Sequence, residues 1–292
     1  MTQTRTAFIA IVGCPNVGKS SILNRLLGQK VAVVSPKPQT KRTKIMGVLS
    51  DDEVQRGVID TPGFHRPRTK LGEKMIKAVS DSISGVDACL FVVEPSGELR
   101  DAEKDLLKKF KDEKMPVILA INKIDSVKQK ELLIERMAQF SALYDFEAIV
   151  PCSALKGDGF GDLKDELFKQ AQPSPHFFPD DTLTDQPERV LAAEIIREKL
   201  LNLLDDEVPH GVAVCIERMH EREDSNITDI DATIYCERES HKGIIIGKKG
   251  EMLKKVSTKA REDMERFFMC KINLHCWVKD IEGWRNREGL IH

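Results

Sequence analysis

No pair of cysteines in the sequence has the Cys-x-x-Cys spacing, although the chain contains seven cysteines. Several of them lie within apolar, strand-like runs, where a thiol behaves as a small hydrophobic side chain. This pattern predicts reduced and mostly buried thiols, and it argues against a disulfide framework and a structural zinc site. The residues concerned are Cys14, Cys89, Cys152, Cys215, Cys236, Cys270 and Cys276.

Long apolar runs and a surplus of one charge are missing too. No run approaches the roughly 20 residues of a membrane-spanning helix, and residues 1–6 lack the apolar stretch of a signal peptide, which predicts a cytoplasmic protein. The chain has 45 lysines and arginines against 47 aspartates and glutamates, so affinity for nucleic acid has to come from a local basic segment. Its 292 residues are enough for two domains.

A glycine-rich segment near the N-terminus carries the strongest functional signal. Residues 7–12 are apolar like a buried strand, residues 13–20 read Gly-Cys-Pro-Asn-Val-Gly-Lys-Ser, and residues 21–27 have helical spacing. Glycines let backbone N–H groups point into such a loop, and the helix N-terminus adds partial positive charge, so the loop suits a polyphosphate. In this pattern Lys19 reaches the β- and γ-phosphates, and the Ser20 hydroxyl is a ligand of Mg²⁺.

A second part of the same site follows a predicted hairpin over residues 45–59. Its second strand leads into Asp60, Thr61, Pro62 and Gly63. A carboxylate at this strand end can hold Mg²⁺ through water, and the Gly63 N–H can approach a γ-phosphate. The predicted catalytic residues are therefore Lys19, Asp60 and Gly63.

Further apolar runs over 88–93 and 116–121 are separated by a charged helical stretch over 100–114. Such alternation predicts an α/β fold with a mostly parallel sheet covered on both faces, and ligands bind at the carboxyl ends of its strands. The motif over residues 122–125, Asn-Lys-Ile-Asp, lies at such an end, and residues 149–155 form a last strand and a turn.

These two segments predict a site for guanine. The Asp125 carboxylate can accept hydrogen bonds from the ring N–H and the exocyclic amine, which adenine lacks, and a buried acceptor left unpaired by the wrong base costs about 1–3 kcal/mol. Asn122 is expected to brace the loops, and the Lys123 stem is expected to lie over the base. The turn formed by Ser153, Ala154 and Leu155 can offer backbone N–H groups to the guanine oxygen.

The four loops, at residues 13–20, 60–63, 122–125 and 153–155, occur in the order and rough spacing of the Ras-like GTPases. The first half resembles the translation-factor-related GTPases, and the whole chain resembles the Era family of bacterial ribosome-assembly GTPases. The resemblance implies a Ras-like P-loop GTPase domain over residues 1–171 and Mg²⁺-dependent hydrolysis of GTP to GDP and phosphate. The positions that match the phosphate-binding motif are Gly13, Asn16, Val17, Gly18, Lys19, Ser20 and Ser21.

Two positions depart from the Ras-like pattern. Phe64 stands where Ras-like enzymes have the glutamine that positions the attacking water, and relatives share this hydrophobic substitution, so slow unaided hydrolysis is implied. In the first switch loop, Lys41 aligns with the threonine that closes on Mg²⁺ in the family. Either Thr40 or Thr43 takes over, or the loop closes without a direct ligand. The switch I residues are Gln39, Thr40, Lys41, Arg42 and Thr43.

Asn16 suggests a second ion. It matches the phosphate-loop asparagine that holds K⁺ against the phosphates in potassium-stimulated relatives. Stimulation of this chain by K⁺ is therefore a hypothesis.

The second half begins after residues 172–187, a proline-rich segment unsuited to a helix and predicted to be a linker. Residues 188–204 read as an amphipathic helix, and residues 212–217 and 230–236 have strand composition. A Gly-x-x-Gly turn and a strand over 271–278 follow. This order resembles a type II KH domain, an α+β fold that binds RNA, here over residues 188–292.

The Gly-x-x-Gly turn is the predicted RNA contact. In KH domains it joins two helices and clamps about four single-stranded nucleotides by their backbone. From Lys242 to Lys271 the chain has nine basic against four acidic residues, which is a local nucleic-acid footprint. The predicted RNA-binding residues are Gly247, Lys248, Lys249, Gly250 and Lys254. Trp277 alternates with apolar residues and is expected to pack in the core, while the role of Trp284 stays open.

Together these features predict a cytoplasmic GTPase whose nucleotide state controls RNA binding. The resemblance implies that it binds the single-stranded 3′ end of 16S rRNA, assists maturation of the small ribosomal subunit, and associates loosely with the inner face of the cell membrane. The sequence has no lipidation motif that would explain the membrane association. In one alternative, the KH domain binds RNA constitutively and the nucleotide does not gate it. In another, the switch acts on a protein partner.

Overall fold

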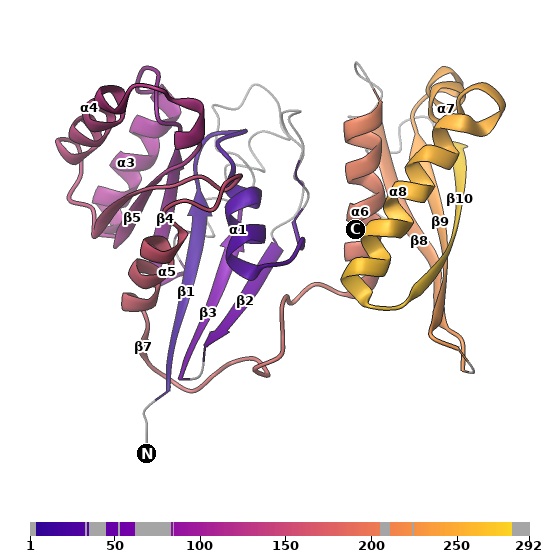
Figure 1. Cartoon of the computed structure of the whole chain (residues 1–292), viewed down its shortest axis with the longest axis horizontal. Coiled ribbons are helices and arrows are strands. Elements are labelled where there is room, and N and C mark those ends of the chain that lie inside the picture. The colour runs from indigo at the N-terminus through magenta and orange to yellow at the C-terminus, as the bar shows by residue number, and fades with distance from the viewer. Residues whose placement is uncertain are drawn as a thin grey trace. The chain divides into compact units, whose positions relative to one another are not determined.

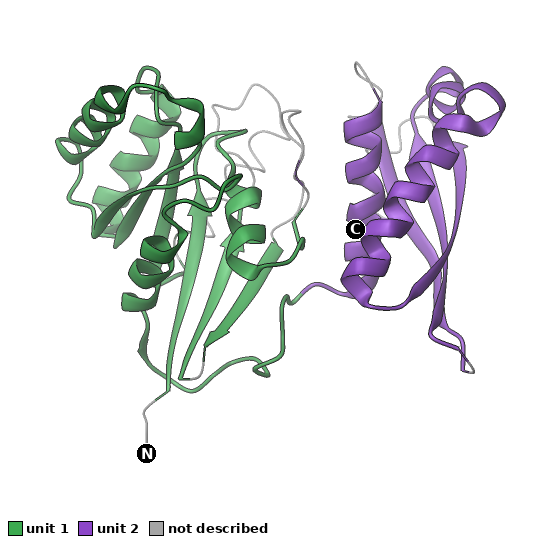
Figure 2. Ribbon diagram, viewed as in Figure 1, with its two compact units in different colours: residues 1–32, 41–185 green, residues 33–40, 186–292 purple. Residues whose placement is uncertain are grey.

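The computed structural model describes residues 4–32, 34, 45–51, 53–61, 83, 85–204, 211–223 and 225–281. The chain divides into two compact units (Figure 2), one made of residues 1–32 and 41–185 and the other of residues 33–40 and 186–292. This division places residues 172–185 of the predicted linker with the first unit.

The first unit is built on one sheet in the strand order β2-β3-β1-β4-β5-β6, with β7 paired to β1 (Figure 1). Strand β1 is parallel to β3 and β4, and β5 is parallel to β4 and β6, whereas β2 and β7 run antiparallel to their partners. The predicted α/β fold with a mostly parallel sheet is confirmed. The strands are β1 (Arg5–Val12), β2 (Ile45–Asp51), β3 (Val54–Asp60), β4 (Ala88–Val93), β5 (Val117–Ile121), β6 (Ala148–Pro151) and β7 (Gln172–Pro173).

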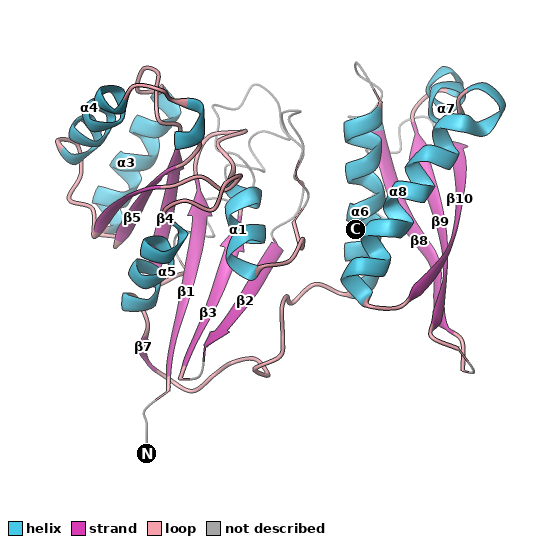
Figure 3. Cartoon of the chain, viewed as in Figure 1, coloured by secondary structure: helices cyan, strands magenta, loops and turns pink. Residues whose placement is uncertain are grey.

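Helices cover both faces of this sheet (Figure 3). On one face, Phe110 of α3 and Phe140 of α4 meet Phe91 of β4 edge-to-face. On the other, Leu23 of α1 lies against β2 at Gly47. The central strands are buried on both sides, which explains why their sequences are apolar without alternation. Among the described residues, the α-helices of this unit are α1 (Lys19–Leu27), α3 (Asp101–Glu113), α4 (Lys130–Ser141) and α5 (Phe160–Lys169).

Residues 172–185, which we call the strap, are held along the first unit. The buried Gln55 side chain of β3 accepts hydrogen bonds from the N–H groups of Phe177 and Phe178 and donates one to the Phe178 carbonyl, each at 2.9 Å. Further on, Val48 N donates to Leu183 O at 2.9 Å. The strap therefore pairs with the outer edge of β2.

The second unit is a three-stranded sheet in the order β10-β9-β8, with β10 parallel and β8 antiparallel to β9. Ile196 of α6 and Val256 of α8 pack with Ile234 of β9 in one buried cluster. The element order matches the predicted KH arrangement, and the strands are longer than predicted. The elements are α6 (Glu188–Leu203), β8 (Val212–Glu221), β9 (Ile227–Cys236), α7 (Glu239–Ile246), the 3-10 turn η3 (Lys248–Gly250), α8 (Glu251–Phe268) and β10 (Lys271–Asp280).

Candidate guanine-nucleotide site and RNA interface

The glycine-rich loop connects β1 to α1 and closes tightly around the side chain of Lys19. Lys19 is only 7% exposed, and its Nζ donates to the carbonyl oxygens of Gly13 at 3.1 Å and Cys14 at 2.8 Å. Gly18 has a φ of 100°, and a Cβ at this position would lie 2.2 Å from Asn122 Nδ2. Only glycine fits there, because both the backbone angle and the space exclude a side chain.

Asn122 joins three loops at the carboxyl edge of the sheet. It follows β5 directly and is 2% exposed. Its Nδ2 donates to Val17 O at 2.9 Å, and its Oδ1 accepts from Ala154 N at 3.0 Å. The structure thus places Asn122 between the phosphate loop and the turn after β6, where it was expected to act as a brace.

The predicted guanine contacts lie together on two neighbouring loops. Asp125 is in the 3-10 turn η1 (Ile124–Ser126), and its Oδ1 accepts a 2.5 Å hydrogen bond from Ser153 Oγ. Ser153 Oγ in turn accepts from Lys156 N at 3.0 Å. Asp125 is exposed, and Leu155 is 74% exposed. An oriented carboxylate on an accessible edge is what recognition of two N–H groups on one base requires.

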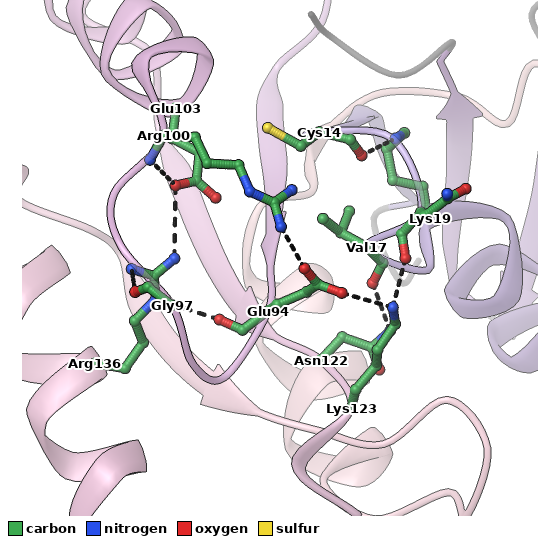
Figure 4. A network of polar contacts seen from close by, with 11 residues as sticks. Cys14, Val17, Lys19, Glu94, Gly97, Arg100, Glu103, Asn122, Lys123 and Arg136 are labelled. Atoms are coloured by element: carbon green, nitrogen blue, oxygen red, sulfur yellow. Dashed lines mark hydrogen bonds and ion pairs between the residues drawn. The ribbon is translucent and has the colours of Figure 1, made fainter. Parts of the chain in front are cut away.

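Lys123 bridges the loop over residues 122–126, which we call the guanine loop, and the glycine-rich loop over residues 13–20, which we call the phosphate loop (Figure 4). Its Nζ donates to Asn16 O at 2.6 Å and forms an ion pair with Glu94 Oε1 at 2.7 Å. Sequence reasoning missed Glu94, which comes directly after β4, and Arg100, which pairs with it. The signal was available, since Glu94 is a carboxylate at the same strand edge that suggested roles for Asp60 and Asn122.

Two hard oxygen donors suited to Mg²⁺ border the phosphate loop. Ser20 is in the first turn of α1, and Asp60 is the last residue of β3, fully buried opposite Ile11 of β1. Thr61 Oγ1 donates to Ile11 O at 2.7 Å and ties the end of β3 to β1. Hydroxyl and carboxylate oxygens are the ligands that this ion prefers, so both residues fit the predicted metal role. The remaining predicted residues here, Gly63, Phe64, Gln39, Thr40, Lys41, Arg42 and Thr43, lie outside the described residues.

The thiols near the loop do not provide a nucleophile. Burial and the Glu103 carboxylate raise the pKa of Cys14, although Arg100 and Lys19 oppose this shift. Burial also raises the pKa of Cys152 to about 12. Both thiols are therefore protonated at neutral pH, and the chemistry of the site rests on its oxygen and nitrogen groups.

The candidate RNA interface is the turn between α7 and α8. Gly247 and Gly250 have φ angles of 74° and 80°, and nothing lies within 4 Å of a Cβ built on Gly250. Lys248, Lys249 and Lys254 are exposed around this turn. An open glycine backbone at a helix N-terminus with lysines beside it suits a phosphate backbone.

The prediction that Trp277 packs in the core is wrong. Its side chain is 49% exposed and lies edge-to-face with His275 at 6.0 Å between ring centroids. In β10 the neighbouring residues Cys276 and Val278 face the helices, so Trp277 has to face the opposite side of the sheet. Trp284 lies outside the described residues.

None of the helices in the described part of the chain has the length and the apolar composition of a membrane-spanning segment.

Comparisons with known proteins match both units. A family model described as a 50S ribosome-binding GTPase matches residues 8–123, and a KH domain model matches residues 207–285. GTPase Era of Clostridioides difficile (strain 630) is 46% identical over 288 residues, which is 99% of this chain and 97% of that protein. GTPase Era of Ruminiclostridium cellulolyticum is 48% identical over 287 residues, which is 98% of this chain and 96% of that protein.

Two solved structures are similar over nearly the whole chain. A variant of Aquifex aeolicus Era bound to GDP and AlF4⁻ has a TM-score of 0.92 and 36% identity, covering 99% of this chain and 98% of that one. Era in complex with MgGDPNP and nucleotides 1506–1542 of 16S ribosomal RNA has a TM-score of 0.90 and 37% identity, covering 99% of this chain and 97% of that one.

Proposed function

The chain belongs to the Era family of GTPases, and we propose that it binds the 3′ region of 16S rRNA through its KH domain and assists maturation of the small ribosomal subunit. It is a GTPase, and its first unit holds the guanine-nucleotide loops described above. The observation that carries the proposal is that one chain combines this nucleotide site with an open, lysine-flanked Gly-x-x-Gly turn. The related Era complex contains both MgGDPNP and an rRNA fragment.

In this function the nucleotide is bound both at its phosphates and at its guanine base. Lys19 neutralises phosphate charge, and Asp125 selects guanine. Ser20 and Asp60 would hold Mg²⁺, which neutralises charge on the phosphates when it is bound. Gly63 and a switch I threonine would complete the phosphate site. Phe64 cannot orient a water molecule, so unaided turnover is expected to be slow.

The finer part of the proposal is that nucleotide state controls RNA binding. A γ-phosphate can order switch loops that are released on hydrolysis, and a ligand shifts a conformational equilibrium by its differential affinity for the two states.

The cytoplasmic location and peripheral membrane contact stay predictions from the sequence and the resemblance.

The test is the affinity of the full chain for a short RNA that copies the 3′ end of 16S rRNA, measured by fluorescence anisotropy. We expect tighter binding with a non-hydrolysable GTP analogue than with GDP. Equal affinity in both states would contradict gating and favour constitutive RNA binding. No binding in either state would favour a protein target.

Two glycine variants assign the RNA contact. Gly250→Asp puts a negative charge and a strained backbone at the turn and should abolish RNA binding while GDP affinity is kept. Gly161→Asp is the matched control, because it makes the same change at an exposed position of α5 with open space around it. Equal RNA affinity in the two variants would argue against the assignment.

A further inference from the structure

Glu94 occupies a central position in the nucleotide site although it belongs to none of the predicted motifs. It follows β4, which pairs with β1 on one side and β5 on the other. The loops after β1 and β5 are the phosphate loop and the guanine loop. The topology therefore places the Glu94 carboxylate between the two loops that hold the two ends of the nucleotide.

Both oxygens of this carboxylate are paired (Figure 4). Oε1 lies 2.7 Å from Lys123 Nζ, and Oε2 lies 2.5 Å from Arg100 Nη2. The Arg100 guanidinium also interacts electrostatically with the Cys14 side chain in the phosphate loop. Burial favours a raised pKa for Glu94, but the hydrogen bonds from Lys123 and Arg100 outweigh it and lower the pKa, so Glu94 is charged at neutral pH.

The loop that carries Glu94 is held in place by hydrogen bonds from Arg136 of α4. Arg136 of α4 is buried and donates to Glu94 O at 3.3 Å and Gly97 O at 3.0 Å. Its guanidinium pairs with the buried Glu103 at 3.5 Å, and Glu103 Oε2 accepts from Arg100 N at 2.8 Å. The carboxylate of Glu94 is therefore presented from a braced loop.

A lysine needs such a partner if its stem is to serve as a binding surface. The ammonium sits on a flexible four-carbon chain, and ordering that chain costs up to about 2 kcal/mol. At Lys123 the carboxylate of Glu94 and the carbonyl of Asn16 hold the ammonium at one place. The stem is thereby ordered before the base arrives, which lowers the cost of binding.

We infer that Glu94 is a positioning residue for guanine-nucleotide binding, which acts by holding Lys123 against the phosphate loop. It preorganises the surface on which the base lies, and through Arg100 it connects this surface to Cys14 of the phosphate loop. The inference rests on the nucleotide site of this GTPase and is independent of whether nucleotide state gates RNA binding.

The first experiment compares Glu94→Gln with the wild-type chain by the affinity and dissociation rate of fluorescent GDP. The glutamine keeps the size but loses the charge, and we expect GDP to bind about tenfold more weakly, mostly through faster dissociation. Glu98→Gln is the matched control, because Glu98 is an exposed glutamate in the same loop. Equal GDP affinity of Glu94→Gln and wild type would overturn the inference, whereas a wild-type chain that fails to bind GDP would overturn the nucleotide site itself.

A double-mutant cycle separates positioning from a purely structural role. If Glu94 acts through Lys123, then adding Glu94→Gln to Lys123→Gln should weaken GDP binding by no more than about twofold further. A full tenfold effect in both backgrounds, accompanied by a lower melting temperature of the nucleotide-free protein, would assign Glu94 to the stability of the fold. Glu94→Asp keeps the charge and should lose only about threefold, and a loss as large as that of Glu94→Gln would also contradict positioning through charge.

Discussion

Asp125→Asn changes the hydrogen-bonding character of one side chain in the guanine loop while keeping its size. In the structure Ser153 Oγ donates to Asp125 Oδ1 at 2.5 Å, and the backbone of Lys156 orients that hydroxyl at 3.0 Å. An asparagine oxygen can keep the bond from Ser153. Its NH₂ group then replaces the second carboxylate oxygen, so a donor stands where guanine presents its own N–H groups.

The size of the effect follows from the one hydrogen bond that guanine would lose and from the two donors that would then face each other. A bond to a charged group contributes about 1.5–3 kcal/mol and a donor left without an acceptor costs about 1–3 kcal/mol more, so the change should cost about 2.5–6 kcal/mol. This corresponds to a loss of GDP affinity of roughly two to four orders of magnitude. Xanthine has a carbonyl where guanine has its exocyclic amine, so it can accept a bond from the new NH₂ group and should bind better than guanine.

The assay is competition of GDP and XDP against a fluorescent nucleotide, with wild type and variant measured at the same salt concentration. Asp145→Asn removes the same charge from an exposed position outside the site and should change neither affinity. Ser153→Ala should weaken GDP binding by about tenfold, because the remaining carboxylate loses its orienting bond. Unchanged GDP affinity in Asp125→Asn would refute the assignment of Asp125 to the base.

Three further predictions concern other parts of the molecule. Gln55→Leu should destabilise the first unit by about 2–4 kcal/mol in urea unfolding, because three backbone groups of Phe177 and Phe178 lose their partner; a loss below about 0.5 kcal/mol would show that the strap contributes little. Hydrogen bonds from Arg222 and Asn273 hold the pKa of Asp229 well below its ordinary value, so its stabilisation is present above about pH 4 and is lost as the pH falls further. The difference in melting temperature between wild type and Asp229→Asn should therefore shrink below pH 4, and a difference that stays constant with pH would contradict a stabilising role of the charged Asp229 carboxylate. If Asn16 holds K⁺, GTP turnover should be faster in KCl than in NaCl, and equal turnover would remove the hypothesis.

The fold was predictable because its signals are local. Residues 7–27 combine a buried strand, a glycine loop and a helix within one short segment, and each part constrains the next. The loops at Asp60 and Asn122 follow apolar strands, and parallel strands bring their carboxyl ends to one edge. The position of the guanine site could therefore be inferred without knowing any side-chain contact.

Trp277 shows a signal that was present and given too little weight. The apolar residues Ile272, Leu274, Cys276 and Val278 of β10 share one parity, and they are the residues that pack under the helices. Trp277 has the opposite parity. Where the described helices lie on one face of a sheet, period-two alternation decides burial more strongly than the size of an apolar side chain.

The strap could not be inferred from composition, because its conformation depends on a partner far away in the sequence. A proline-rich extended segment looks the same whether it is free or packed, and the residue that holds it, Gln55, is 123 positions from Phe178. Yet Gln55 is itself anomalous, as a polar amide that is fully buried within β3. A buried amide has to find partners for its donors and its acceptor, and most side-chain hydrogen bonds go to main-chain groups or to water. Gln55 and Glu94 are thus the same kind of residue, a polar side chain whose place in a strand or at its end makes sense only once its distant partner is known. In this chain Gln55 holds the strap against β3, and Glu94 connects the two loops of the nucleotide site through Lys123.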